Sequence, residues 1–304
     1  MTTSMYFSAE RIQVLQGKFH KGKLRVDKAF NEPLPEGTMI NGVITNEVAV
    51  TRALVNISNV LNLKKQFIDL VVDSSSILTK RLCVPVLPEK KLLALVASEF
   101  TEVSENYEEL IYDYGVIARK NPQGEGGVIL CSAMENTFAF GYIDIFNKLK
   151  LRLNSIDIAV SASIGLAGFI PDFQEKTFII SVLESNTLVS YLFVQGQYYY
   201  TGRNRLLANR GSQESIGEIA KAISALIQFN QSQKTESDIT EVYFCGLRAD
   251  EYDLIAALSE TYAIEISPMP DFPQIEAATD LNYRLAHNFY VTGNLLIKDG
   301  SYHG

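Results

Sequence analysis

The feature that most constrains the fold is a pair of strand-like segments, joined by a tight turn, that occurs twice in the chain. The first pair lies in residues 5–17, MYFSAERIQVLQG, and the second in residues 180–196, ISVLESNTLVSYLFVQG. Each pair is followed by a third strand-like segment, at 23–34 and 197–204, and then by a helical pattern. The repeated order of hairpin, strand and helix predicts an α/β protein built from two related halves.

Length and charge exclude several classes of protein. The 304 residues suffice for one large α/β unit or two domains. A formal charge of −8 argues against a general nucleic-acid binder, which needs a broad basic surface to neutralise phosphates, so we expect no nucleic-acid partner. Three dispersed cysteines, Cys83, Cys131 and Cys245, are typical of reduced thiols in a cytoplasmic protein. The first residues lack a signal peptide, and the longest apolar stretch, 158–170, is too short to span a bilayer. We therefore expect a soluble protein that reaches a membrane only through partners.

Capping residues and apolar spacing place the helices. A closing helix is expected over 276–297, where apolar positions again recur at helical spacing. Three earlier helix starts are marked by capping residues: Thr45 with Asn46, Ser132 with Glu135, and Ser215 with Glu218.

No motif for metal or nucleophilic chemistry stands out. The three histidines, His20, His287 and His303, have no metal-ligand spacing, so we expect no metal site. The glycines of 121–127 lack the lysine and Ser/Thr that end a phosphate-binding P-loop. The sequence also has no G-x-S-x-G nucleophile elbow. We therefore assign no catalytic residue.

A basic cluster lies on the first hairpins, at Lys18, Lys21, Lys23, Arg25 and Lys28. The simplest interpretation is an ordinary solvated turn. The alternative is a surface that faces anionic lipid or an acidic partner.

Several segments, in the correct order, resemble the type IV pilus assembly protein PilM family. They are NEPLPEGTMINGVITNEVAVTRALVNI at 31–57, ILTKRLCVPVLPEKKLLALVASEF at 77–100, LFVQGQYYYTGR at 192–203 and VYFCGLRAD at 242–250. The similarity spans most of residues 5–297. PilM proteins are similar to the division protein FtsA, and the resemblance implies the actin-like ATPase fold, in which two RNase-H-like halves flank a cleft and one half carries an inserted subdomain.

The resemblance also implies subdomain boundaries. We expect a first half at 1–76 and 153–175, an inserted subdomain at 77–152, a second half at 176–210 and 271–299, and a subdomain of that half at 211–270.

The phosphate-binding motifs of actin-like proteins are altered in this chain. Those proteins hold nucleotide with an aspartate and with glycines whose backbone N–H groups approach the phosphates. The corresponding aspartate, glycine and lysine of the first turn fall on Tyr6, Ser8 and Gln13. Glu184 lies near the expected glycine of the second turn, and the third motif keeps Gly246 but continues with Leu247 and Arg248, where family members usually have paired glycines. We therefore expect a degenerate nucleotide cleft that binds neither ATP nor Mg²⁺.

A protein-binding groove is the site that the resemblance supports. PilM-like proteins hold the short cytosolic N-terminal tail of the inner-membrane protein PilN between the first half and its inserted subdomain. Here the groove walls map to the strand at 77–84, the helix at 90–100 and the strand at 110–117. The expected apolar wall residues are Leu82, Val84, Phe100, Ile111 and Tyr114.

The sequence thus predicts a cytoplasmic scaffold at the inner face of the cell membrane. It would bind a PilN-like tail, and other platform and motor components of a type IV pilus machine, without hydrolysing ATP. Two alternatives remain open: an active actin-like ATPase with diverged phosphate loops, and a component of a type II secretion or FtsA-like division system.

Overall fold

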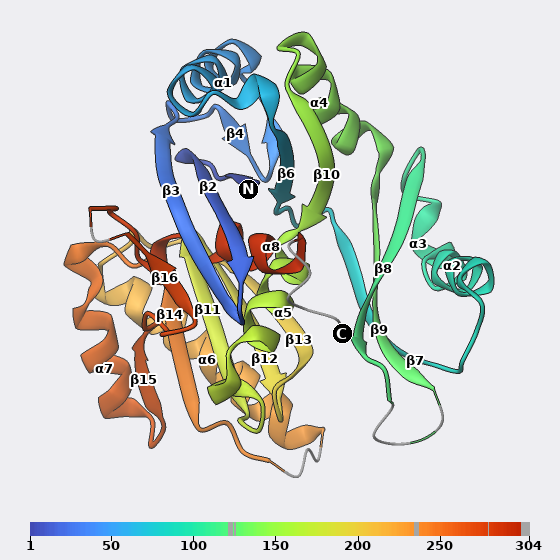
Figure 1. Ribbon diagram of the computed structural model, residues 1–304. Helices are drawn as coiled ribbons and strands as arrows, with labels where there is room; N and C mark the ends of the chain where they lie inside the picture. The colour runs from blue at the N-terminus through green and yellow to red at the C-terminus, as the bar shows by residue number, and fades with distance from the viewer. Residues whose placement is uncertain (121–123, 125, 234–236, 279, 299–304) are drawn as a thin grey trace.

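The computed structural model describes residues 1–120, 124, 126–233, 237–278 and 280–298. Figure 1 shows a small sheet with α2 and α3 at one side of the molecule, and α7 at the opposite side. Two larger sheets lie between them.

The first large sheet has six strands in the order β10-β6-β1-β2-β3-β16. The strands are β1 (Thr2–Phe7), β2 (Arg11–His20), β3 (Lys23–Pro33), β6 (Phe67–Val72), β10 (Arg152–Ile158) and β16 (Ile275–Ala277). Helices α1 (Glu47–Leu61) and α4 (Asn136–Lys148) share one hydrophobic cluster with this sheet, whereas α5 (Ala159–Phe169) and α8 (Phe289–Lys298) belong to the cluster on its other face. The sheet is therefore buried on both faces.

The second large sheet has five strands in the order β13-β12-β11-β14-β15. They are β11 (Phe178–Glu184), β12 (Thr187–Val194), β13 (Gln197–Arg205), β14 (Glu241–Cys245) and β15 (Glu265–Pro268). Helices α6 (Gln213–Ser232) and α7 (Asp253–Thr261) pack on one face, and the other face joins the cluster that contains α5 and α8. Helices α5 and α8 thus lie in the core between the two large sheets.

The inserted sheet has the order β7-β9-β8, with β7 (Leu78–Val84), β8 (Leu110–Ala118) and β9 (Gly127–Glu135). Helix α2 (Glu89–Ser98) packs on one face through a separate small core, and α3 (Thr101–Ser104) follows it. The remaining short elements are β4 (Met39–Ile40), β5 (Val43–Ile44), η1 (Leu63–Lys65), η2 (Pro171–Phe173), η3 (Ala249–Glu251) and η4 (Leu285–His287).

The duplication predicted from the two hairpins is present. In each large sheet the first two strands pair antiparallel, the third extends the hairpin, and a later strand joins the first in parallel. The turns are residues 8–10 and residues 185–186. The α/β class is confirmed, with the two hairpin turns as equivalent points of the two sheets.

Two of the predicted helix caps are wrong, and one is confirmed. Asn46 caps α1 by accepting a hydrogen bond from the N–H of Ala49 at 3.1 Å. Ser132 instead lies inside β9, where strand pairing overrides the capping pattern, and no side chain caps α4. Helix α6 begins one turn earlier than predicted, because the hydroxyl of Ser212 accepts from the N–H of Ser215 at 3.2 Å.

The predicted closing helix over 276–297 is also wrong in its first half. That segment starts in β16, which pairs in parallel with β3, and α8 begins only at Phe289. Helix α8 then approaches α5 so closely that a Cβ on Gly293 would lie 2.1 Å from the carbonyl oxygen of Ala162. Both β16 and α8 fall in the range 271–299 that was expected in the second half, yet they pack on the first sheet. The subdomain boundaries themselves stay a prediction.

Candidate functional site

The first hairpin turn, at the entrance of the cleft between the large sheets, satisfies its own backbone. The hydroxyl of Ser8 accepts hydrogen bonds from the N–H groups of Glu10 (3.3 Å) and Arg11 (3.1 Å). The N–H of Ser8 donates to the carbonyl of Arg11 at 2.9 Å. A phosphate cradle needs N–H groups that point freely at the ligand. In this turn the N–H groups of Glu10 and Arg11 are bonded to the Ser8 hydroxyl instead.

A buried arginine, Arg210, forms hydrogen bonds that fix the second turn. The guanidinium of Arg210 donates to the carbonyls of Ser185 (3.2 Å) and Gly246 (2.9 Å) and forms an ion pair with Glu251. Both charged side chains are buried. Burial opposes ionisation of Glu251, but the hydrogen bonds from Arg210 and from the backbone of Arg248 lower its pKa. Arg210 therefore joins the turn after β11 to the end of β14.

Gly246 is required by this arrangement. Its φ of +77° lies in the left-handed region, and a Cβ would lie 2.3 Å from the carbonyl oxygen of Leu183. Its N–H donates to the carbonyl of Ala286 at 2.9 Å. This glycine thus serves close packing of three backbone segments.

Large side chains occupy the space between the two turns. The hydroxyl of Tyr6 donates to Oε2 of Glu184 at 2.6 Å, and the ring centroids of Tyr6 and Tyr290 are 4.9 Å apart. The hydroxyls of Tyr191 and Tyr290 are 2.9 Å apart. Burial raises the pKa of Glu184 to about 7, although the bond from Tyr6 and the charge of Arg11 act in the opposite direction. The two halves are therefore linked by side chains at the base of the cleft.

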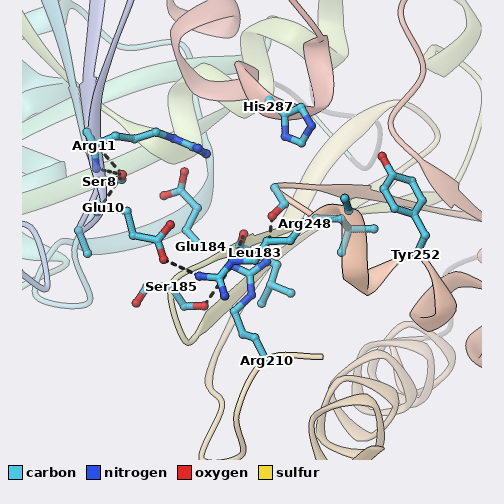
Figure 2. A pocket seen from close by; sticks show the side chains of 14 residues that line it. Ser8, Glu10, Arg11, Leu183, Glu184, Ser185, Arg210, Arg248, Tyr252 and His287 are labelled. Atoms are coloured by element: carbon cyan, nitrogen blue, oxygen red, sulfur yellow. Dashed lines mark hydrogen bonds and ion pairs between the residues drawn. The ribbon is translucent and has the colours of Figure 1, made fainter. Parts of the chain in front are cut away.

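The cavity that remains above these side chains is small. Its volume is about 270 Å³, below the roughly 300–1,000 Å³ of most ligand pockets. Figure 2 shows the side chains around it, among them Arg11, Tyr252 and His287. Arg248 spans the cleft by an ion pair of 2.9 Å with Glu10.

The residues predicted for the cleft lie together, in two layers. Ser8, Glu184, Gly246 and Leu247 line the cavity. Tyr6 and Gln13 lie buried outside its lining, where the amide of Gln13 donates to the carbonyl of His287 at 2.6 Å. The prediction did not include Arg11 or Arg210. It noted Arg248, two residues after Gly246 in CGLRAD, only as a departure from the family's paired glycines.

A larger groove of about 640 Å³ lies between the inserted sheet and the first half. One wall comes from β8 and the neighbouring β9, and the opposite side comes from α4, β10, α5 and the end of α8. Strand β8 ends its sheet, so its outer edge has no paired strand in the described part of the chain. The groove is lined by apolar side chains that include Val116, Ile143, Ile156, Ile164 and Ile297.

Two of the five predicted groove residues line this groove. They are Ile111, which is 40% exposed, and Tyr114, which also packs against the small core beneath α2. Val84 and Phe100 are buried instead in the small core beneath α2, and Leu82 packs against that core. The reason is the strand order, because β9 separates β7 from β8 and α2 covers the opposite face. That Ile111 and Tyr114 contact a partner's tail stays a prediction.

The charged groups of the groove are few. Asp157 forms an ion pair of 2.9 Å with Lys298, Asp113 on β8 is exposed, and Arg119, just after β8, also lines the groove. Across the described residues, no three or more His, Cys, Asp or Glu side chains gather as metal ligands would. No helix in the described ranges is both long and apolar enough to cross a membrane.

Comparison with solved structures shows the fold. The chain is similar to a structure described as a PilM-PilN type IV pilus biogenesis complex, with a TM-score of 0.81 and 11% identity over 98% of both chains. It is also similar to a Bacteroides thetaiotaomicron protein of actin-like ATPase fold and unknown function (TM-score 0.52, 10% identity, 88% of this chain and 90% of that one). A third similar structure is the ethanolamine utilization protein EutJ of Carboxydothermus hydrogenoformans (TM-score 0.50, 10% identity, 97% and 89%). The fold is therefore actin-like.

Comparison of sequences shows the family. A search of curated proteins gives no match. Residues 5–200 match the family described as type IV pilus assembly protein PilM, and this range is more than half of the chain. Together with the folded hairpins and the inserted sheet, this match shows that the chain belongs to the PilM family of type IV pilus assembly proteins.

Proposed function

We propose that the protein is a cytoplasmic scaffold of type IV pilus assembly, and that its groove holds the N-terminal tail of a PilN-like inner-membrane protein. The observation that carries the proposal is the unpaired edge of β8 along an apolar groove of about 640 Å³. The similar structure is described as a complex of PilM with PilN, which favours a partner of that kind.

The groove suits an extended peptide. Consecutive residues of β8 from Ile111 to Ile117 line it, so the backbone of this strand faces the groove along its length. A peptide that adds a strand to such an edge gains main-chain hydrogen bonds, and its alternate side chains enter apolar pockets. The opposite side offers Ile143 of α4 and Ile156 of β10 as apolar contacts.

We also propose that this scaffold does not hydrolyse ATP. The N–H groups of Glu10 and Arg11 in the first turn are bonded to Ser8, and Tyr6 and Glu184 meet between the turns. A carboxylate at Glu184 would repel a triphosphate. In this proposal, side-chain contacts in the cleft join the two halves of the protein, and nucleotide is not needed there.

The test is calorimetric titration of the protein with a synthetic peptide of its PilN-like partner's N-terminal tail. We expect saturable one-to-one binding, with a scrambled peptide of the same composition as control. The proposed role would be contradicted if the tail peptide, at concentrations up to about 1 mM, gave no heat of binding and did not displace a labelled copy of itself from the protein.

A further inference from the structure

We propose that the first sheet docks onto an anionic lipid surface through the strand ends on the side where β1, β6 and β10 begin. We call this end of the sheet the basic rim. It comprises Lys18, Lys21, Lys23, Arg25, Lys64, Lys65 and Arg152, with Met1 and Phe67 among them. The inference rests on the proposed function in one respect: a scaffold that binds the tail of an inner-membrane protein lies near the membrane.

Strand register brings the basic rim together from distant parts of the chain. Arg152 of β10 pairs with Phe67 of β6, and Thr3 of β1 pairs with both Ile68 and Gln16. Beyond this row, Lys18 lies opposite Arg25 and His20 lies opposite Lys23 on the β2–β3 hairpin. The ends of these strands therefore form one continuous border.

A polar contact adds the segment after α1 to the same border. The amide oxygen of Gln66 accepts from Nε2 of Gln16 at 2.6 Å and from the hydroxyl of Thr3 at 2.7 Å. Lys64 and Lys65 immediately precede Gln66 and are exposed. Two further cations thus lie beside the start of β1.

The charge of the basic rim is only partly neutralised within the protein. Arg25 pairs with Asp27 at 3.0 Å and Lys23 with Glu276, but Lys18, Lys21, Lys64 and Lys65 form no ion pair with any described residue. Lys18 lies directly opposite Arg25, so the β2–β3 hairpin places two cations side by side, and Asp27 pairs with only one of them. The chain as a whole carries −8, so a basic border is not a consequence of composition.

Exposed apolar side chains distinguish a lipid surface from an acidic protein as the occupant. Phe67 is 61% exposed, and the guanidinium of Arg152 lies 5.7 Å from the centroid of its ring. Met1 is 64% exposed. Aromatic and apolar groups flanked by lysine and arginine are typical of surfaces that enter the headgroup region of anionic bilayers.

The position of the basic rim agrees with a partner held in the groove. Strand β10 starts at Arg152 in the rim, and its last residues, Ile156 to Ile158, line the groove. The strand's seven residues span roughly 20 Å. A membrane protein whose tail lies in the groove would therefore keep the basic rim within a short distance of the bilayer.

Co-sedimentation with vesicles tests the proposal. The probes are vesicles of phosphatidylcholine with about 30 mol % phosphatidylglycerol, and vesicles of phosphatidylcholine alone. We expect the protein to sediment with the anionic vesicles only, and the bound fraction to fall as salt is raised from about 0.05 to 0.3 M. Equal sedimentation with both vesicles, or with neither, would overturn the proposal.

Matched charge reversals locate the contact. The rim variant Lys18→Glu/Lys21→Glu/Lys64→Glu/Lys65→Glu changes four exposed side chains, and we expect it to lose at least about tenfold in vesicle affinity. The control Lys90→Glu/Lys91→Glu/Arg205→Glu/Lys221→Glu makes the same change in net charge at exposed positions elsewhere. We expect the control to lose less than about threefold, since distant charges are screened. Equal losses in both would show a non-specific charge effect and overturn the proposal.

Two further measurements separate the possible occupants and the two proposals. Phe67→Ser, which leaves the charge unchanged, should also weaken binding to anionic vesicles; an unchanged affinity contradicts the lipid contact. Binding of the wild-type chain to polyglutamate, without binding to vesicles, would assign the rim to an acidic protein. The rim variant should bind the tail peptide as the wild type does. Peptide binding therefore tests the proposed function, and vesicle binding tests the lipid contact separately.

Discussion

The hydroxyl of Tyr6, on the first strand of one half, donates a hydrogen bond of 2.6 Å to Oε2 of Glu184, on the first strand of the other half. The two residues lie next to the two hairpin turns that are equivalent in the duplicated fold. Around them, Tyr191 bonds Tyr290, and Asp73 after β6 forms an ion pair with Arg203 of β13. Direct side-chain contacts thus join the halves.

The first prediction concerns this hydrogen bond. Tyr6→Phe removes the donor and leaves the carboxyl of Glu184 without it, so we expect the free energy of unfolding to fall by about 1–3 kcal/mol. Urea denaturation measures the change. Tyr200→Phe is the matched control, because Tyr200 is 42% exposed; it should change stability by less than about 0.5 kcal/mol. Equal effects of the two variants would contradict a special role for the Tyr6 hydroxyl.

The second prediction concerns pH. Burial raises the pKa of Glu184 from its usual 4.5 to about 7 in the folded protein. Between these values the folded state binds more protons than the unfolded state, so the contribution of Glu184 to stability is present below about pH 4.5 and is lost as pH rises toward 7. The slope for one proton cannot exceed about 1.4 kcal/mol per pH unit.

Glu184→Gln isolates this contribution. The amide oxygen still accepts from Tyr6, but the side chain cannot ionise. We expect the stability of the variant relative to the wild type to increase from pH 5 to pH 8, as measured by urea unfolding at each pH. A difference that stays constant with pH would show that Glu184 does not titrate in this range.

The third prediction concerns the buried ion pair behind the second turn. Arg210→Ala leaves Glu251 buried without its cation and frees the carbonyls of Ser185 and Gly246, so we expect a loss of about 3–5 kcal/mol. Arg205→Ala is the control at an exposed position and should cost less than about 0.5 kcal/mol. The double variant Arg210→Met/Glu251→Leu should recover part of the loss, because no unpaired charge remains.

The fourth prediction concerns the groove. Ile111→Asp/Val116→Asp places two charges on exposed positions of β8, so we expect tail affinity to fall by more than about tenfold while the melting temperature changes little. Val103→Asp, on α3 outside the groove, is the control. Calorimetry with the tail peptide measures all three proteins. Unchanged affinity in the β8 variant would place the tail elsewhere.

The sequence was informative where the pattern is local. Two hairpins with strand-like flanks predict the duplicated halves, because alternation and turn position are encoded in adjacent residues. The groove residues show the limit. Val84 and Phe100 are apolar, as a groove wall requires. The strand order β7-β9-β8 and the packing of α2 instead bury both residues in the small core beneath α2, away from the groove. Arg210 was missed because its partner Glu251 lies 41 residues later.

The fifth prediction concerns nucleotide. If Mg-ATP occupied the cleft at a concentration 100 times its dissociation constant, it would stabilise the folded state by about 2.7 kcal/mol and raise the melting temperature by several degrees. We expect no rise at about 5 mM Mg-ATP, because the N–H groups of Glu10 and Arg11 in the first turn are bonded to Ser8 and the cavity volume is only about 270 Å³. Magnesium alone and ATP alone are the controls. A rise that grows with Mg-ATP concentration and is absent in both controls would show that the cleft still binds nucleotide, and would favour the actin-like ATPase over the scaffold.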